Sequence, residues 1–339
     1  MELNNTPVRT SKNFNINNIK LDFEIPQNIK SFDNVEVSCA SSSMDEDLNF
    51  VYGVGLDFKN SNHKVNINLK DGDNARIVYT FDDDNLNLVN ELLVHANGDS
   101  SLTIVYNSKT TKHCFHNGGL KIIANDGARL NVNVINFLNE DSDSFENIEN
   151  VIGKNSKVSY TIVDLGGKNS ITNYYADIKG ESAENDLKTI YLGTDNQLKD
   201  INYIAELRGR KTNIDIDVQG ALAGSAKKNF KGTIDFKSGC KKSKGNENEF
   251  CMLLSDKAKS IALPMLLCSE DDVEGNHSTA SGKVDANDLF YIMSRGIEYK
   301  EAIKLIIRAR FHKIIENIKD EDIKQEILQE IDRRLDKWV

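Results

Sequence analysis

Three short segments in the middle of the chain decide the fold: NSKVSYTIV at 155–163, GESAENDLKTIYL at 180–192 and GRKTNIDIDV at 209–218. Each begins with a polar turn and continues into a run rich in Val, Ile or Leu with polar residues between them, a pattern typical of a β-strand. The turns recur about every 25 to 30 residues, which favours a solenoid whose coils stack parallel strands. Many short strands are also found in β-sandwiches and jelly rolls, so these two folds stay open on the pattern alone.

Similar strand-like segments fill the region from residue 35 to residue 265, separated by clusters of Gly, Asn, Asp and Ser. No amphipathic helical pattern of about a dozen residues interrupts them, which argues against a βαβ fold. We therefore predict a mainly β protein in which residues 35–282 form a parallel β-helix. Residues 1–34 are polar and rich in Asn, and we predict that they form an extended N-terminal arm.

Beyond Gly282 the pattern changes to that of helices, so we predict a helical C-terminal segment at 283–339. Asp285 is suited to cap the first helix and Gly296 to end it. A second helix is expected from Glu298, and a third follows the charged residues 319–322. The apolar stripes of these helices need cover. They could pack against one another and the solenoid, or form a docking groove for a partner.

The composition narrows the possible functions. With 42 Lys and Arg against 52 Asp and Glu, the net charge is −10, which disfavours binding to nucleic acid or to an anionic membrane surface. No stretch reaches the roughly 18 apolar residues of a membrane span, and the N-terminus lacks the pattern of a signal peptide. The five cysteines are an odd number and widely scattered, as expected for reduced thiols. We therefore expect a cytoplasmic protein.

Several segments carry a recognisable family pattern. They are DLGGKNSITNY at 164–174, IYLG at 190–193, FKGTI at 230–234, LLSDKA at 253–258, EDDVEGNH at 270–277 and LFYIMSRGI at 289–297. In these segments the chain resembles the SufB/SufD family, whose members serve iron-sulfur cluster assembly in the SUF system. The resemblance is dense over 155–318 and weak before residue 150.

The resemblance implies a fold and partners. The fold would be a right-handed parallel β-helix that pairs with a second SufB/SufD-type subunit, either itself or a paralogue. The helical tail would bind a SufC-type ABC ATPase through Leu289, Phe290, Tyr291, Arg295, Gly296 and Ile306. The chain itself would be a non-catalytic scaffold or scaffold partner that binds no nucleotide, since it has no Gly-x-x-x-x-Gly-Lys-Ser/Thr loop.

The resemblance also implies a transient iron-sulfur cluster, for which thiolate, imidazole and carboxylate are suitable ligands. His277 matches the position of a functional histidine of the family, and we take Cys268 and Glu274 as further candidates and Cys251 as a weaker one. Each has an alternative: His277 could be an ordinary surface histidine, and Cys268 could be a buried structural cysteine.

Two departures from the family pattern favour a SufD-like or short undifferentiated protein. Glu249 stands where SufB has a cysteine, and Ser278 follows the histidine where SufB has a carboxylate. A structural subunit without its own cluster is therefore the main alternative. A β-helix polysaccharide lyase or hydrolase is a remote one, because aromatic residues make up only 7% of the chain and Trp338 is its single tryptophan.

Two further clusters are expected to be structural. His113, Cys114 and His116 offer three ligand types in four residues, but neighbouring strand positions point to opposite faces, so we expect a solvated loop. We expect an exposed face of the solenoid for a group of lysines: Lys227, Lys228, Lys231, Lys237, Lys241, Lys242 and Lys244.

Overall fold

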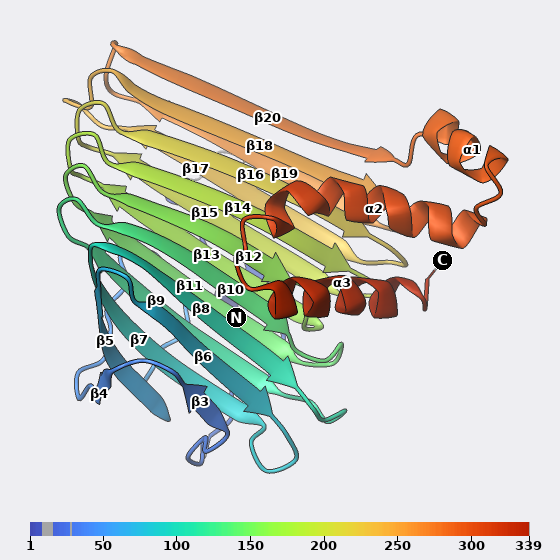
Figure 1. Ribbon diagram of the computed structural model, residues 1–339, viewed down its shortest axis with the longest axis horizontal. Coiled ribbons are helices and arrows are strands. Elements are labelled where there is room, and N and C mark those ends of the chain that lie inside the picture. Colours follow the sequence, from blue (N-terminus) through green and yellow to red (C-terminus); the bar gives the residue numbers. More distant parts are fainter. Residues whose placement is uncertain (9–15, 28, 339) are drawn as a thin grey trace.

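The computed structural model describes residues 1–8, 16–27 and 29–338. Part of the predicted N-terminal arm, residues 9–15 and 28, therefore lies outside the described residues, as does residue 339. In the described part the chain winds into a stack of strands with three helices on one side (Figure 1).

Two facing sheets, each of nine strands in the described part, form the stack. The even sheet contains β3 (Val35–Val37), β6 (Asn74–Phe81), β8 (Asp99–Ser108), β10 (Arg129–Phe137), β12 (Lys157–Asp164), β14 (Glu184–Gly193), β16 (Asn213–Leu222), β18 (Ser243–Leu253) and β20 (Val273–Lys283). The odd sheet contains β4 (Ser41–Ser43), β5 (His63–Lys70), β7 (Asn87–Asn97), β9 (Phe115–Ala124), β11 (Asp143–Ile152), β13 (Asn169–Ile178), β15 (Leu198–Leu207), β17 (Lys227–Phe236) and β19 (Lys259–Cys268).

From β5 to β20 consecutive strands alternate between the two sheets and pair in parallel within each sheet. This arrangement confirms the predicted parallel β-helix with a helical C-terminal segment. It excludes the sandwich and the jelly roll, which are built from antiparallel strands. The division of the chain into arm, core and tail as separate units stays a prediction.

The polar turns before the strands explain the repeat in the sequence. Each has one residue in the left-handed region with φ between 53° and 63°: Asn155, Ser182, Lys211 and Lys242. The backbone N–H of that residue donates to a carbonyl of the next coil, as from Asn155 to Glu181 (3.0 Å) and from Ser182 to Arg210 (2.9 Å). The turns therefore stack with the same register as the strands, and their backbone groups are satisfied.

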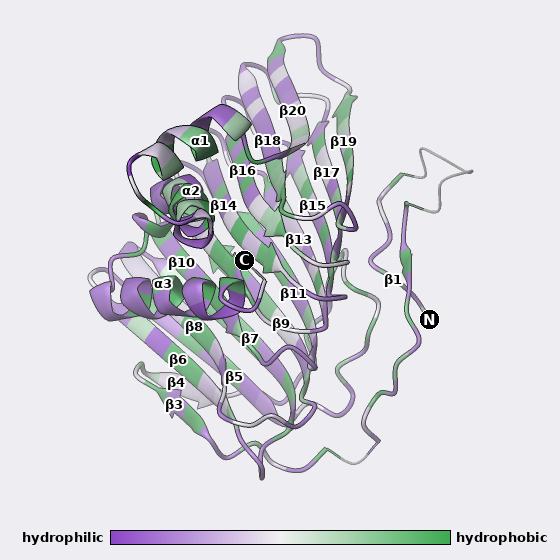
Figure 2. Ribbon diagram, turned by 90° about the vertical axis from the view of Figure 1, so that its right-hand side faces the viewer, coloured by the Kyte–Doolittle hydropathy of each residue, from purple (hydrophilic) through white to green (hydrophobic). Residues whose placement is uncertain are grey.

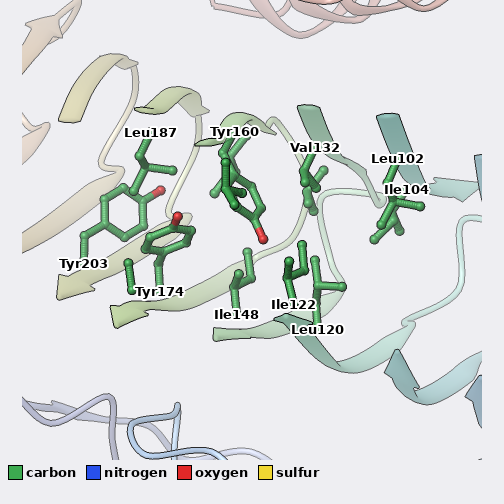
Figure 3. Close-up of a cluster of buried hydrophobic side chains, with 14 of the residues drawn as sticks. Leu102, Ile104, Leu120, Ile122, Val132, Ile148, Tyr160, Tyr174, Leu187 and Tyr203 are labelled. Carbon is green, nitrogen blue, oxygen red and sulfur yellow. The ribbon is translucent and has the colours of Figure 1, made fainter. Parts of the chain in front are cut away.

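Alternate residues of the strands from β5 to β19 point into the space between the two sheets and form one continuous core. Figure 3 shows part of it, with aliphatic side chains of neighbouring coils facing one another and Tyr160, Tyr174 and Tyr203 packed side by side. The rings of Tyr160 and Tyr174 lie 5.1 Å apart and those of Tyr174 and Tyr203 lie 5.7 Å apart, both edge to face, the geometry that aromatic pairs prefer.

The outer faces of the two sheets are covered by opposite ends of the chain (Figure 2). The tail forms α1 (Ala286–Ser294), α2 (Tyr299–Ile315) and α3 (Glu321–Leu335), and α2 and α3 bury their apolar stripes on the even sheet. The N-terminal residues, including the antiparallel pair β1 (Glu2–Leu3) and β2 (Ile19–Lys20), cover part of the odd sheet. There Asn4 donates to the Asp200 carboxylate at 2.6 Å.

The two ends of the stack differ. At the N-terminal end β3 and β4 pair antiparallel with β6 and β5. At the C-terminal end β19 and β20 are the last strands of their sheets, and most residues of β20 are exposed. The predicted helix limits at this end are confirmed, since the Asp285 carboxylate accepts from the N–H groups of Asn287 and Asp288 and Gly296 has a φ of 86°. No helix of the described residues is long and apolar enough to cross a membrane.

Candidate functional site

His277 lies in the middle of β20, on the last coil of the solenoid, and is exposed. In the parallel register its Cα partner on β18 is Glu247. Residues in register on neighbouring parallel strands point to the same side of the sheet, so the Glu247 side chain fixes the direction for His277. Glu247 is buried between the sheets, and His277 therefore faces the interior side of a coil that has no further coil above it.

Glu247 is unusual because its carboxyl group has no partner. Both of its oxygens are buried without a hydrogen bond in the described structure. It faces Gly232 on the opposite strand β17, where an added Cβ would come within 2.0 Å of Glu247 Oε2. Burial, with a smaller effect of the negative charge of Glu249, raises the pKa of Glu247 to about 8.

Glu249, two residues further along β18, is in contrast fully paired. Its Oε1 lies 2.8 Å from Nζ of Lys228, and the Tyr191 hydroxyl donates to the same oxygen at 3.1 Å. Both charged side chains are buried. Glu249 is therefore one half of a buried ion pair, which is costly to break from one side.

Cys251, the weaker candidate ligand, lies in the same part of the core. Its side chain is fully buried, and burial raises the pKa of its thiol. A raised pKa keeps the thiol protonated, whereas a metal ligand must be a thiolate. In this conformation Cys251 is the least suited of the candidates to hold metal.

Cys268 and Glu274 are exposed but lie apart from the Glu247 carboxyl group. Cys268 ends β19 on the odd sheet, and its thiol donates to the Glu270 carbonyl at 3.0 Å. The alternative that Cys268 is a buried structural cysteine is wrong, because it is exposed. Glu274 near the start of β20 pairs with Lys244 at 2.9 Å. Within residues 1–8, 16–27 and 29–338, no three His, Cys, Asp or Glu side chains are grouped so that they could hold a metal ion.

The expectation of a solvated loop at 113–116 is wrong for three of its four residues. His113 is exposed, but Cys114, Phe115 and His116 are buried. His116 points into the core, where Nε2 contacts Asn90 Oδ1 (3.1 Å) and Nδ1 contacts Ser144 Oγ (3.2 Å). Burial lowers the pKa of His116 to about 3, so the imidazole is neutral.

Glu146 belongs to the same group of buried side chains, and we call the site formed by His116, Glu146 and Gly118 the enclosed pocket. Its Oε2 lies 3.9 Å from His116 Nε2, it hydrogen bonds with Tyr106, and burial raises its pKa to about 8. A Cβ at Gly118 would come within 2.9 Å of both Glu146 oxygens. This pocket was not predicted from the sequence. The available sign was the glycine pair 118–119 inside a strand, since glycine in a strand often marks a close approach of other groups.

The expectation that the lysine group is an exposed face is also wrong in part. Lys227, Lys241, Lys242 and Lys244 are exposed. Lys228 is buried in the ion pair with Glu249, and Lys231 is buried in a 2.6 Å pair with Asp200 beneath the N-terminal residues. Successive side chains of a β-strand point to opposite faces of the sheet. Here the core covers one face of the strand and the N-terminal residues cover the other.

A groove of about 810 Å³ lies between α1, α2 and β16. Its apolar lining includes Tyr291, Ile292, Leu305, Ile306 and Ala309, and its rim carries the charged residues Asp217, Asp288, Arg310 and Lys313. Of the predicted partner-binding residues, Leu289 packs partly against the even sheet, while Phe290 and Tyr291 are 74% and 58% exposed. Arg295 donates to the Tyr291 hydroxyl at 2.9 Å and lies over its ring.

The fold and the site define the chain as a parallel β-solenoid with an uncovered last coil and an exposed apolar groove beside its helical tail. Residues 79–310 match the family model described as SUF system FeS cluster assembly, SufBD core domain. The match covers more than half of the chain, so the chain belongs to the SufB/SufD family. The predicted family is thereby confirmed.

Individual relatives agree with this assignment. The chain is 26% identical to the iron-sulfur cluster assembly protein SufD of Bacillus subtilis over 265 residues, which is 77% of this chain and 61% of the relative. It is 29% identical to a SufBD family protein of Pyrococcus horikoshii over 49% of this chain and 37% of the relative. It is 32% identical to SufD of Escherichia coli over 31% of this chain and 25% of the relative. The chain thus spans between a quarter and three fifths of these relatives.

Proposed function

We propose that this chain is a non-catalytic subunit of a SUF assembly complex that binds a SufC-type ABC ATPase and helps to build and transfer iron-sulfur clusters. The observation that carries the proposal is the groove between α1 and α2. The apolar stripes of α2 and α3 are buried on the even sheet, yet none of the residues of α1 is buried. An exposed apolar surface of this kind is suited to a protein partner.

The groove has the composition of a binding hot spot. Tyr291 is held by Arg295 through a hydrogen bond and a cation–π contact with 4.9 Å between the Arg295 guanidinium and the ring centroid, and Phe290 beside it is free of cover. Aromatic residues and arginine dominate binding energy at protein interfaces. Gly296 ends α1, and Ile306 forms part of the groove floor.

The second proposed partner is another SufB/SufD-type subunit, and the open end of the solenoid supports it. The last strands β19 and β20 each have a neighbour on one side only, which leaves a row of backbone groups ready to pair with another strand. Pairing there would cover His277, and Cys268 and Glu274 would lie beside the junction. We propose these three residues as ligands of a transient cluster, and Cys251 as a weaker candidate.

The SufD-like structural subunit remains the second candidate, and the ion pair of Glu249 with Lys228 favours it. A buried carboxylate bound to a lysine and a tyrosine hydroxyl cannot accept sulfur as a cysteine does. As a SufD-like structural subunit, the chain would support a partner subunit that carries the cluster.

Co-purification with a cognate SufC-type ATPase tests the proposal. The parent should form a stable complex, and Phe290→Ala and Tyr291→Ala should each weaken binding by about tenfold or more, as expected for exposed aromatic anchors. Val51→Ala is the matched control, since Val51 is 64% exposed but lies among the N-terminal residues. Deleting the whole tail would be less informative, because it would uncover the apolar outer face of the even sheet. Equal binding by parent and both aromatic variants would place the docking surface elsewhere.

A further inference from the structure

The unpartnered carboxyl group of Glu247 needs an explanation. It is the one side chain in residues 1–8, 16–27 and 29–338 with two buried polar atoms that lack a partner. A buried polar group without a hydrogen bond costs a protein about 1–3 kcal/mol or more, and such groups often mark the place of an absent ion or ligand.

The surroundings of Glu247 keep space for it but offer it no cation. Gly232 stands opposite, and any larger residue would collide with the carboxyl group. The nearest interior lysine, Lys228, already donates hydrogen bonds to Glu249 at 2.8 Å and to the Ile261 carbonyl at 3.2 Å. Lys231 points to the outer face of β17 and binds Asp200 and the Asn4 carbonyl.

The next interior side chain above Glu247 is that of His277. The two residues are register partners on adjacent parallel strands, which lie about 4.8 Å apart, and both face the interior side. No strand lies beyond β20 in the even sheet of the described residues, so the exposed His277 side chain meets solvent and not a further coil on the side away from Glu247. A carboxylate and an imidazole side by side are suitable ligands for a divalent first-row metal such as iron.

We infer that Glu247 and His277 together form an iron-binding site at the C-terminal end of the solenoid, where Glu247 occupies the space that Gly232 leaves for it and His277 lies beside it on the last coil. The inference rests on the proposed function and deepens it, because it adds to His277 a ligand that lies on β18 and not in the loop at 268–277. The two side chains leave the remaining coordination positions of the metal open for sulfide or for ligands from a second subunit.

The test measures binding of Fe²⁺ alone to the full chain by anaerobic equilibrium dialysis, with no ATPase and no sulfide. Glu247→Gln keeps the size of the side chain and removes its charge, and His277→Ala changes an exposed residue that does not support the core. Each should weaken Fe²⁺ binding by at least about 10- to 100-fold, the loss seen even for residues that only support metal ligands. Glu146→Gln is the matched control, because Glu146 is also a buried glutamate beside a glycine, and it should bind as the parent does.

Three results would overturn the inference: no Fe²⁺ binding by the parent, parent-like binding by either folded variant of the pair, or an equal loss in Glu146→Gln. Far-ultraviolet circular dichroism of each variant verifies that it is folded, and the exposed His277→Ala variant decides the matter if Glu247→Gln fails to fold. Binding of the ATPase in the groove is measured separately on a different surface. Failure of the iron site and failure of the proposed function are therefore distinguishable.

Discussion

Two places along the solenoid combine the same three residue types on interior positions. In the enclosed pocket these are His116, Glu146 and Gly118. At the C-terminal end of the stack they are His277 on the last coil and Glu247 and Gly232 on the coil before it. In both places the glycine leaves the space that the glutamate occupies, and in both burial raises the pKa of the glutamate to about 8. The chemistry is alike, but the surroundings are not.

In the enclosed pocket every group meets a partner from this chain. His116 contacts Asn90 and Ser144, and Glu146 contacts Tyr106, with further coils on both sides. On the last coil His277 is exposed and both Glu247 oxygens lack partners. Interior polar groups therefore stabilise the fold where they find partners on neighbouring coils, whereas at the end of the stack Glu247 lacks such partners.

The largest expected effect compares the two histidines. His116→Ala should lower the free energy of unfolding by about 3–5 kcal/mol, because it leaves a cavity in the core and removes the partners of Asn90 and Ser144. His277→Ala should change it by no more than about 0.5 kcal/mol, since exposed residues seldom matter more. Urea unfolding of both variants measures the two values. Similar losses at both positions would contradict the prediction that His116 supports the fold and His277 does not.

The second prediction concerns pH and the enclosed pocket. The folded pKa of Glu146, about 8, lies above its ordinary value of 4.5, so its stabilising contribution is complete below pH 4.5 and is lost as the pH rises through 8. The folded pKa of His116, about 3, lies below its ordinary value of 6.5, so its contribution is complete above pH 6.5 and is lost as the pH falls toward 3. Of these two groups only Glu146 is expected to contribute a pH dependence between pH 6.5 and 8, and Glu247, whose pKa is also about 8, adds a contribution of the same sign.

In that window the free energy of unfolding should therefore fall with rising pH, with a slope for this one proton of up to about 1.4 kcal/mol per pH unit. Glu146→Gln, which cannot titrate, should reduce the slope by that amount. Glu274→Gln, which changes an exposed glutamate paired with Lys244, is the control. Urea titrations at closely spaced pH values measure the slopes, and an unchanged slope in Glu146→Gln would show that the pocket is not proton-linked.

The third prediction uses the cysteines as probes of the same difference. Cys114 beside the enclosed pocket is buried, and burial raises the pKa of its thiol, whereas Cys268 at the open end is exposed. Under native conditions iodoacetamide should modify Cys268 first and leave Cys114 unmodified until the core opens. Peptide mass spectrometry over time measures the order. Early modification of Cys114 would mean that the pocket is not enclosed.

The comparison also shows how far the sequence could lead. The repeat of polar turns and alternating strands predicted the solenoid correctly, because the left-handed turn residues such as Asn155 and Ser182 recur with each coil. The limits of α1 were also predictable, since the Asp285 cap and Gly296 are local features.

The partners of interior polar residues could not be predicted in the same way. Glu249 meets Lys228 across 21 residues of sequence and Tyr191 across 58, and nothing in the local pattern links them. Alternation predicts that Lys228 and Lys231 lie on opposite faces of one strand, but not that the N-terminal residues cover the outer one. His116 was assigned to a loop for the same reason, since the strand that buries it was recognisable only from its long-range pairing.

The smallest expected effect concerns the helix caps and the open end. Asp285 and Asp320 cap α1 and α3 in the same way, each accepting from two backbone N–H groups, and replacing either by alanine should cost its helix about 1 kcal/mol. Because α3 buries its stripe on the even sheet, Asp320→Ala should lower global stability by that amount. None of the residues of α1 is buried, so Asp285→Ala should leave global stability unchanged and speed amide hydrogen exchange only at 286–294.

The SufC-type ATPase should restore the slow exchange if it docks on α1. A loss of global stability in Asp285→Ala would instead show that α1 is part of the folded core, and that the last coil and its helix are less open than this comparison holds.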